Sequence, residues 1–345
     1  MVQTVATRAA ILAGAIVFAW ALNGWDNTAL AQQTTLRFHT FVPPVSSSYK
    51  NYVGWLKSIE QKSGDRLKIE AYGSMQLGGK PGDLYNQAKD GVVDVIYVLP
   101  GYTPGVFPRS ATFELPFMGS SSVAQSQALQ EFSGKWLKEE YKDVKPLVFH
   151  AATPALFHMK GKPIRTLEDL QGRKIRGPSA EVVTTLAALE ANPVGIAGAN
   201  ITEAMLRGVV EGMVFPWAIA NANKVIDASD SHTIASMYMP VLIGVMNKRK
   251  YDGLPADLRK LIDDNSGMPL AKQFGEQWEK DDEPGIAQAK KLGHEIIELS
   301  AAEQARWREK AAPVVKTWID EMTAKGHPGR QLVDDARALV AKYAR

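Results

Sequence analysis

The chain has 345 residues, of which 40 are basic and 37 acidic, so its formal net charge is only +3. This near balance argues against a nucleic-acid-binding protein, which would concentrate basic residues on one face or segment. The chain has no cysteine, which excludes a disulfide framework, a thiol nucleophile and a cysteine metal site. Its length allows two domains, each with a hydrophobic core of its own.

The first 31 residues have the features of a secretory signal peptide. Arg8 supplies a positive charge, Ala9–Leu22 is an apolar run, and Ala29–Leu30–Ala31 forms an A-x-A cleavage site. A membrane anchor is the alternative, but the apolar run is short for a bilayer span. We therefore expect cleavage before Gln32 and export to the periplasm, a compartment that permits disulfides without requiring them.

Residues 32 to about 152 alternate between strand and helix patterns, which predicts an α/β lobe. The expected strands are Leu36–Thr40, Leu67–Tyr72 and Val92–Leu99, and the expected helices run from about Tyr49 to Lys62 and from Gly82 to Asp90. Ligands of open α/β sheets bind at the carboxyl ends of strands. Tyr97 and Tyr102, at the end of the third strand, are therefore candidate ligand contacts, with packing against the sheet as the alternative.

Residues 172–217 form a βαβ-like unit that brings a basic residue near two aromatic ones. A strand at Lys174–Arg176 ends at Gly177–Pro178, and Ser179 is placed to cap a helix whose apolar stripe is Val182, Val183, Leu186 and Leu189. Asn192–Pro193 is expected to end that helix. A second helix near Ile201–Arg207 leads to a strand at Gly212–Phe215. A guanidinium is forked and always charged, so it holds a carboxylate with two hydrogen bonds. Arg176 is therefore the candidate residue for binding the carboxylate of a ligand. The alternative is that it forms an ion pair with an acidic residue at the protein surface.

The chain is expected to return to the first lobe near Ile234–Asn247. Leu254–Lys291 then predicts one long helix or two abutting helices that span both lobes, kinked near Pro284 and Gly285. The acidic pair Asp281–Asp282 is typical of a solvated helix face. Helices at Ala301–Thr323 and Gly329–Ala344 end the chain. We expect one lobe to contain residues 32–152 and about 240–285, and the other to contain residues 153–239 and about 286–345.

No catalytic constellation is evident. There is no GxSxG elbow and no HExxH, GxGxxG or GxxxxGK[ST] motif. His150 and His158 are too far apart in sequence to share one helical face. We therefore expect no catalytic residue, no metal site and no cofactor, although a fold never excludes chemistry by itself.

Several segments resemble the extracytoplasmic solute-binding proteins of TRAP transporters, the DctP-like family. GRKIRGP, ANPV and AMLRGVVEGMVFP stand where a typical member reads GLKIRVP, A-PV and YTALQTGVVDGQENP. The resemblance covers nearly the whole chain after the leader. It implies a two-lobed periplasmic-binding-protein fold with the ligand cleft between the lobes, Arg176 as the grip on a ligand carboxylate, and TRAP membrane subunits as partners. GSMQLGGKP is similar to the family's NGQLGG segment, which makes Gln76 a further site candidate beside the alternative of a plain glycine-rich turn.

The departures from the family pattern point to the class of ligand. Phe215 stands where the family has an asparagine, and Gly198 and Ala199 replace a bulky Phe and a Ser. Leu156 and Phe157 stand where some members have a second basic contact. Phe215 and Trp217, two residues apart, are expected to form a wall for a ring, unless Trp217 turns into lobe packing.

These residues together favour a periplasmic receptor for an aromatic or apolar monocarboxylate. A receptor for a polar sugar acid or a dicarboxylate stays open, because the changes could be compensated elsewhere in the site. A sensor or an enzyme on the same fold is the alternative of a different class.

Overall fold

The computed structural model describes residues 33–196 and 201–344, and these residues form two α/β lobes, each built on one sheet. The first sheet contains β1 (Thr34–Thr40), β2 (Leu67–Tyr72), β3 (Val95–Val98), β4 (Val144–Ala151) and β10 (Val241–Asn247). The second contains β5 (Leu156–Met159), β6 (Lys174–Gly177), β7 (Asn192–Gly195), β8 (Gly212–Phe215), β9 (Ser231–Ile234) and β11 (Glu295–Glu298). The strand orders are β2-β1-β3-β10-β4 and β11-β9-β5-β8-β6-β7.

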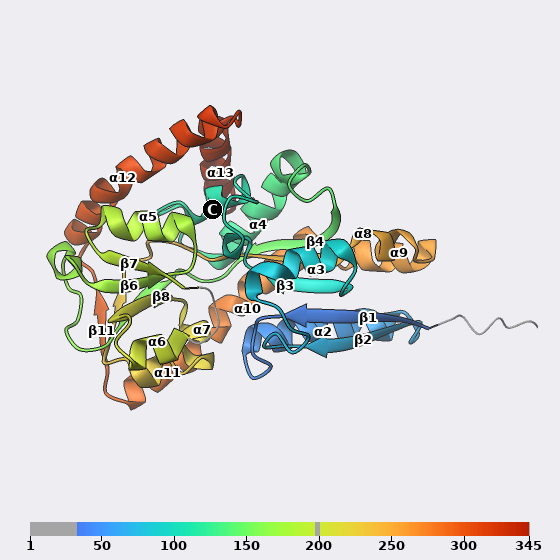
Figure 1. Cartoon of the computed structure of the whole chain (residues 1–345), viewed down its shortest axis with the longest axis horizontal. Coiled ribbons are helices and arrows are strands. Elements are labelled where there is room, and N and C mark those ends of the chain that lie inside the picture. The colour runs from blue at the N-terminus through green and yellow to red at the C-terminus, as the bar shows by residue number, and fades with distance from the viewer. Residues whose placement is uncertain (1–32, 197–200, 345) are drawn as a thin grey trace, which may run out of the picture. The chain divides into compact units, whose positions relative to one another are not determined.

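The helices in the described part of the chain cover these sheets (Figure 1). They are α2 (Ser47–Lys62), α3 (Leu84–Asp90), α4 (Ser122–Phe132), α5 (Ala180–Ala188), α6 (Ile201–Leu206), α7 (Trp217–Ala222), α8 (Lys248–Asp252), α9 (Ala256–Asp264), α10 (Met268–Asp281), α11 (Glu283–Lys291), α12 (Ala301–Ala324) and α13 (Gly329–Tyr343). None of them is long and apolar enough to cross a membrane.

The first lobe is organised around a stack of aromatic rings. β1 pairs in parallel with β3, and β10 lies antiparallel between β3 and β4. The Tyr52 ring of α2 stacks on Phe38 of β1 and on Tyr97 of β3, with centroids 4.9 and 4.7 Å apart. Gly244 of β10 makes room for this ring, since a Cβ there would lie 2.1 Å from the Tyr52 hydroxyl. The stack fixes the strands whose carboxyl ends face the second lobe.

The second lobe sets β6 between two parallel neighbours, β7 and β8. β5 is antiparallel to β8 and β9, and Leu156 lies directly opposite Phe215. α5 ends at Ala188, before the Asn192–Pro193 pair that we expected to stop it, and that pair begins β7. β7 is an edge strand. Proline is tolerated there because its missing backbone N–H can face the side of the strand that has no neighbouring strand to bond.

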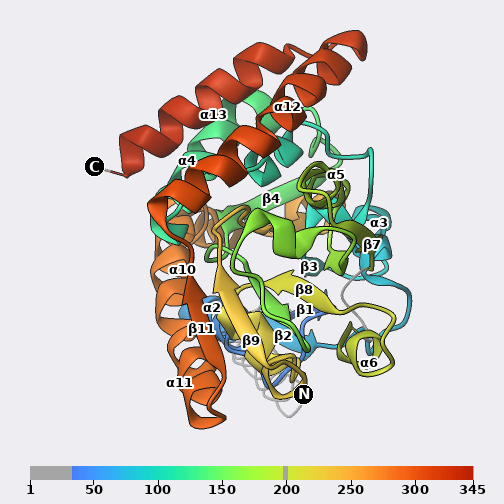
Figure 2. The ribbon, with the colours of Figure 1, turned by 90° about the vertical axis from the view of Figure 1, so that its left-hand side faces the viewer.

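The chain crosses between the sheets from β4 to β5 and returns from β9 to β10. Residues 254–291 form three helices, α9, α10 and α11, rather than the one or two that the sequence predicted, and the last two abut and span both lobes (Figure 2). α10 packs on α2, α4 and β4 of the first lobe, whereas α11 packs on α7 and β11 of the second. The break falls at Asp282, with Pro284 and Gly285 in the first turn of α11.

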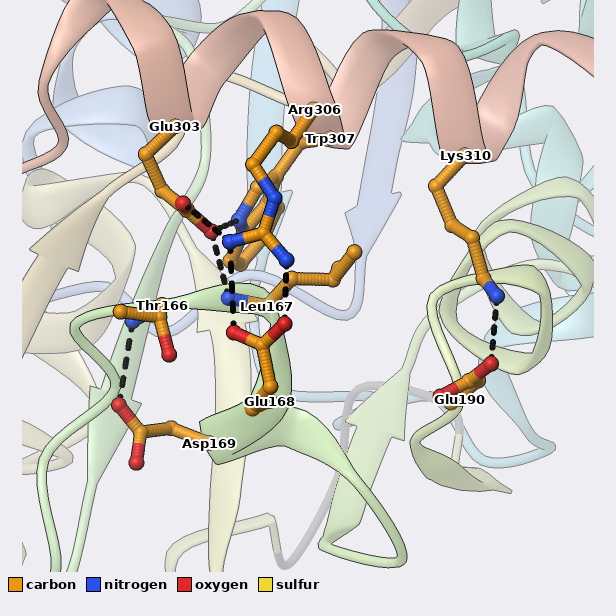
Figure 3. Close-up of polar contacts among 9 residues, drawn as sticks. All are labelled: Thr166, Leu167, Glu168, Asp169, Glu190, Glu303, Arg306, Trp307 and Lys310. Atoms are coloured by element: carbon orange, nitrogen blue, oxygen red, sulfur yellow. Dashed lines mark hydrogen bonds and ion pairs between the residues drawn. The ribbon is translucent and has the colours of Figure 1, made fainter.

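α12 is a further connection, because its two ends pack on different lobes. Figure 3 shows its beginning on the second lobe. There Glu303 accepts from the Leu167 backbone N–H at 2.6 Å and from the Trp307 indole at 2.9 Å. Arg306 pairs with Glu168, and Lys310 pairs with Glu190. Farther along the same helix, Trp318, Ile319 and Met322 join the hydrophobic cluster of the first lobe.

α13 packs on the first lobe, beside α4 (Figure 1). Its apolar face, formed by Leu332, Val333 and Ala336, is fully buried in the first-lobe cluster. This packing differs from the expectation that residues 286–345 belong to the second lobe. The apolar face of α13 packs against α4 of the first lobe. Helical periodicity predicts that a helix has a face to bury, but it does not predict which part of the protein that face packs against.

Candidate ligand-binding site

The central side chain of the candidate site is Arg176, which has no exposed surface. It lies near the end of β6, and the strand stops at Gly177, before Pro178. Its Nε donates to the Ile196 carbonyl at 2.8 Å. Its guanidinium lies over the Phe215 ring, 4.4 Å from the centroid, within the range of a cation–π contact. Two neighbouring segments of one sheet therefore fix the orientation of the guanidinium.

The two terminal nitrogens of this guanidinium have no acceptor among the residues that the structure describes. Nη1 and Nη2 are buried and make no hydrogen bond to any residue in the described part of the chain. Arginine does not lose its proton in proteins, and a buried charge without a partner is costly. The pair of parallel donors matches the two oxygens of a carboxylate.

A cavity beside Phe215 is lined by both lobes. Its residues are mostly apolar or aromatic, and none of the described ones carries a charge. The first lobe and the α10 helix supply Phe41, Val42, Leu99, Tyr102, Leu242 and Trp278, and the second lobe supplies Pro178, Ile201, Phe215, Ala218, Ile219 and Ala222. The Tyr102 ring meets Phe41 edge to face, with centroids 5.2 Å apart. Serines 46–48 and Asn223 add polar groups to the lining. Phe215, over which the Arg176 guanidinium lies, is thus part of a mostly apolar cavity wall.

Tyr238 links the cavity to the arginine. It lies in the segment between β9 and β10, is buried, and lines the cavity. Burial raises the pKa of the Tyr238 hydroxyl well above its usual range, and the nearby Arg176 charge opposes that rise. The hydroxyl is therefore neutral at physiological pH and close to the guanidinium. It can donate a further hydrogen bond to an anion held by Arg176.

A buried carboxyl, Glu114, lies close to the same region but lines a different cavity. Burial raises its pKa to about 7, and the Glu181 charge adds to the rise. Its Oε1 accepts from the Val241 backbone N–H at 3.3 Å. A Cβ on Gly101 would lie 3.1 Å from Oε2 and 2.7 Å from the Cβ of Ser179, so glycine is needed there. Ser179 occupies the N-cap position of α5, as expected, but its side chain makes no capping hydrogen bond.

A chain of three histidines supports the backbone at Phe215. His158 Nε2 lies 3.2 Å from the Phe215 carbonyl, His158 Nδ1 lies 2.8 Å from His232 Nδ1, and His232 Nε2 lies 3.1 Å from His294 Nδ1. A carbonyl only accepts, so the network assigns the proton of neutral His158 to Nε2. Burial lowers the pKa of His158 well below its usual value and that of His232 to about 4. Both rings are neutral at pH 7.

The structure brings three of the predicted site residues together: Arg176, Phe215 and Tyr102. Trp217 lies apart from the cavity lining, because β8 ends at Phe215 and α7 begins at Trp217, so the two aromatics do not share one extended segment. The Trp217 ring packs edge to face on His158, which is the lobe-packing alternative. Leu156 is buried in the same hydrophobic cluster as Trp217.

The remaining predicted residues lie elsewhere or cannot be placed. Tyr97 is buried in the ring stack of the first lobe, between Tyr52 and His150. Gln76 is exposed in a turn closed by its N–H to the Gly73 carbonyl at 3.0 Å. Gly198 and Ala199 lie outside the described residues.

Sequence reasoning missed most of the cavity wall, including Phe41, Tyr238 and Trp278. Phe41 directly follows β1, so the rule that ligands bind at the carboxyl ends of strands would have found it. Tyr238 and Trp278 come from the segment that crosses back to the first lobe and from the α10 helix. No local pattern marks either of them as a cavity residue.

The fold and the buried arginine together define a two-lobed carboxylate-binding receptor. Residues 38–321 match the family of bacterial extracellular solute-binding proteins, family 7 (DctP), and the chain belongs to this family, the extracytoplasmic solute-binding proteins of TRAP transporters. Proteins of this family are periplasmic solute receptors.

Two solved structures and one curated relative illustrate the likeness. A TRAP solute-binding protein from Rhodoferax ferrireducens T118, in complex with copurified benzoate, is 39% identical with a TM-score of 0.88, covering 90% of this chain and 99% of that one. A marine metagenome TRAP protein specific for aromatic acid ligands, in complex with 3-hydroxybenzoate, is 37% identical with a TM-score of 0.89, covering 91% and 100%. The C4-dicarboxylate-binding periplasmic protein DctP of Rhodobacter capsulatus is 26% identical, covering 87% of this chain and 91% of that one.

Proposed function

We propose that this protein binds an aromatic monocarboxylate in the periplasm and delivers it to the membrane subunits of a TRAP transporter. One observation carries the proposal: the two terminal nitrogens of Arg176 are buried without an acceptor among the described residues. The guanidinium lies over Phe215, a ring that also lines a cavity whose described residues carry no charge. The arginine holds the carboxylate, and the cavity holds the ring.

The cavity lining favours an apolar body over a second charge. Burial of apolar surface contributes about 25 cal/mol per Å², so an aromatic ring adds several kcal/mol of gross driving force. None of the described lining residues is a cation. A second carboxylate in this cavity would be desolvated without a partner, which is strongly unfavourable.

The ligands of the similar proteins support the same class. The Rhodoferax ferrireducens protein carries benzoate, and the marine metagenome protein carries 3-hydroxybenzoate. Both likenesses cover at least nine-tenths of this chain. The dicarboxylate-binding relative is less similar, at 26% identity.

Delivery to a membrane partner requires export of the chain. The leader and its cleavage site lie outside the described residues, so cleavage before Gln32 stays a prediction. Mass spectrometry of the periplasmic protein should find Gln32 at the N-terminus. An intact leader on the mature protein would contradict the proposed location.

Calorimetric titration against two sets of acids tests the proposed ligand class. The first set is benzoate, 3-hydroxybenzoate, mandelate and p-coumarate, and the second is succinate, malate and glucuronate. We expect at least one member of the first set to bind with a Kd in the micromolar range or below, and no member of the second to do so. Micromolar binding of the second set with none of the first would overturn the proposal, and turnover of any bound acid would favour an enzyme.

A further inference from the structure

Two consecutive carboxylates at the break between α10 and α11 are bonded to different lobes. Asp281 accepts from the Asn51 side chain of α2 at 2.8 Å and from Gln277 at 2.8 Å. Asp282 Oδ1 accepts from the Ala218 backbone N–H of α7 at 2.9 Å. Both side chains are partly buried, so the expectation of a solvated acidic face is wrong here. Asp281 holds the break to the first lobe, and Asp282 holds it to the second.

The break lies between two walls of the ligand cavity. Trp278, one turn before it on α10, lines the cavity, and so do Ala218 and Ile219 of α7. α11 rests directly on the start of α7, since a Cβ on Gly285 would lie 2.8 Å from the Trp217 carbonyl oxygen. Any change of angle at the break therefore moves the α7 wall relative to Trp278.

The Asp282 carboxylate is suited to hold α7 in place. The Ala218 N–H belongs to the first turn of α7, where helix amides have no intrahelical partner. Burial raises the pKa of Asp282 to about 6, with the charges of Asp281 and Glu279 adding to the rise. α7 itself carries no titratable side chain. At pH 8 the carboxylate is ionised, and an ionised acceptor makes a stronger hydrogen bond than a neutral one.

We propose that Asp282 is a positioning residue that fixes the distance between α7 and Trp278, and so limits the width of the ring that the cavity accepts. The part of this inference that concerns ring width rests on the proposed aromatic ligand. The part that concerns the position of α7 does not.

Hydrogen exchange of the ligand-free full-length mature protein at pH 8 tests the position of α7. We expect the Ala218 amide to exchange about tenfold faster or more in Asp282→Ala, because it loses a charge-assisted acceptor. Asp282→Asn keeps an acceptor oxygen and should restore most of the protection. Asp281→Ala is the matched control, since it removes the neighbouring charge without touching α7. Unchanged exchange in Asp282→Ala, or an equal effect in Asp281→Ala, would overturn the proposal.

Titration with benzoate and 2-naphthoate tests the effect on ring width. In Asp282→Ala the ratio of the 2-naphthoate Kd to the benzoate Kd should fall at least fivefold. Glu283→Ala, which removes the next carboxylate along the chain, an exposed one, should keep the wild-type ratio. A simple loss of folding would weaken both acids alike, and an unchanged ratio would overturn the role in ring selection. If the wild type and all variants fail to bind an aromatic acid, the proposed ligand class is wrong. The hydrogen exchange of the Ala218 amide then still tests whether Asp282 positions α7.

Discussion

Arg176 and Glu114 are two buried ionisable side chains in neighbouring regions. They differ in whether the side chain can avoid the cost of a buried charge by becoming neutral. Neither pairs with a group of opposite charge in the described part of the chain. Glu114 can take up a proton, because burial raises its pKa to about 7. Arginine side chains have no such option, since a guanidinium does not lose its proton in proteins. The difference supports the proposal that the arginine region takes an external anion, whereas the Glu114 carboxyl can neutralise itself by binding a proton.

The largest expected effect comes from changing the group that cannot neutralise itself. Arg176→Lys keeps the charge but loses the forked pair of donors. We expect aromatic-acid affinity to fall by about 2–4 kcal/mol, or roughly 30- to 1000-fold. Calorimetric titration measures it, with Arg173→Lys as the control, because Arg173 directly precedes β6 and already pairs with Glu211. Affinity within about threefold of wild type would remove Arg176 from the site.

Glu114→Gln tests the other half of the comparison through pH. The pKa of Glu114 rises from its ordinary 4.5 to about 7 on folding, so folding favours its protonated form. The contribution of Glu114 to the free energy of unfolding is fully present below pH 4.5 and is lost as the pH rises through 7. The free energy of unfolding of the wild type falls by up to about 3 kcal/mol from this cause. Glu114→Gln should lack this loss. The free energy of unfolding of Glu114→Gln minus that of the wild type should therefore be larger at pH 8 than at pH 5.

Urea unfolding of both proteins at the two pH values measures this difference, and the other titrating groups cancel in the comparison. Ligand affinity is the control and should stay within about twofold of wild type. An equal stability difference at pH 5 and pH 8 would show that Glu114 is ionised without cost. A large loss of affinity would place Glu114 in the ligand site.

A smaller effect is expected at Tyr238, where a neutral donor assists the arginine. Tyr238→Phe should weaken aromatic-acid binding by about 1.5 kcal/mol, or roughly tenfold, because it removes one hydrogen bond to a charged acceptor. Tyr85→Phe is the matched control, since it removes the hydroxyl of a buried tyrosine outside the cavity lining. If both variants bind as the wild type does, the Tyr238 hydroxyl does not contact the ligand.

The fold class could be predicted from the sequence, and so could the strand and turn that hold Arg176. Arg176 sits in a strand–turn–helix pattern whose residues are contiguous, so local signals were enough. Phe215 belongs to the same unit: β8 follows β6 after α5, β7 and α6, and pairs with it in parallel. The two-lobed α/β fold followed from alternating strand and helix patterns and from the family resemblance.

Most of the cavity wall could not be predicted in the same way. Phe41, Tyr238 and Trp278 are far apart in the sequence and meet only through tertiary packing. The paired role of Phe215 and Trp217 relied on strand alternation continuing past Pro216, but a helix starts there. The hydrogen bond of Asp282 to α7 could not be predicted from the sequence. A pair of acidic residues in a helix has the same local pattern whether it faces water or another part of the protein.

The central claim is that the cavity holds one carboxylate at Arg176 and an uncharged ring beyond it. The most direct measurement compares benzoate with isophthalate, which carries a second carboxylate on the same ring, by calorimetric titration under one set of conditions. The account predicts that benzoate binds at least a hundredfold more tightly, because the described cavity lining offers no partner for the second charge. Equal or tighter binding of isophthalate would contradict it.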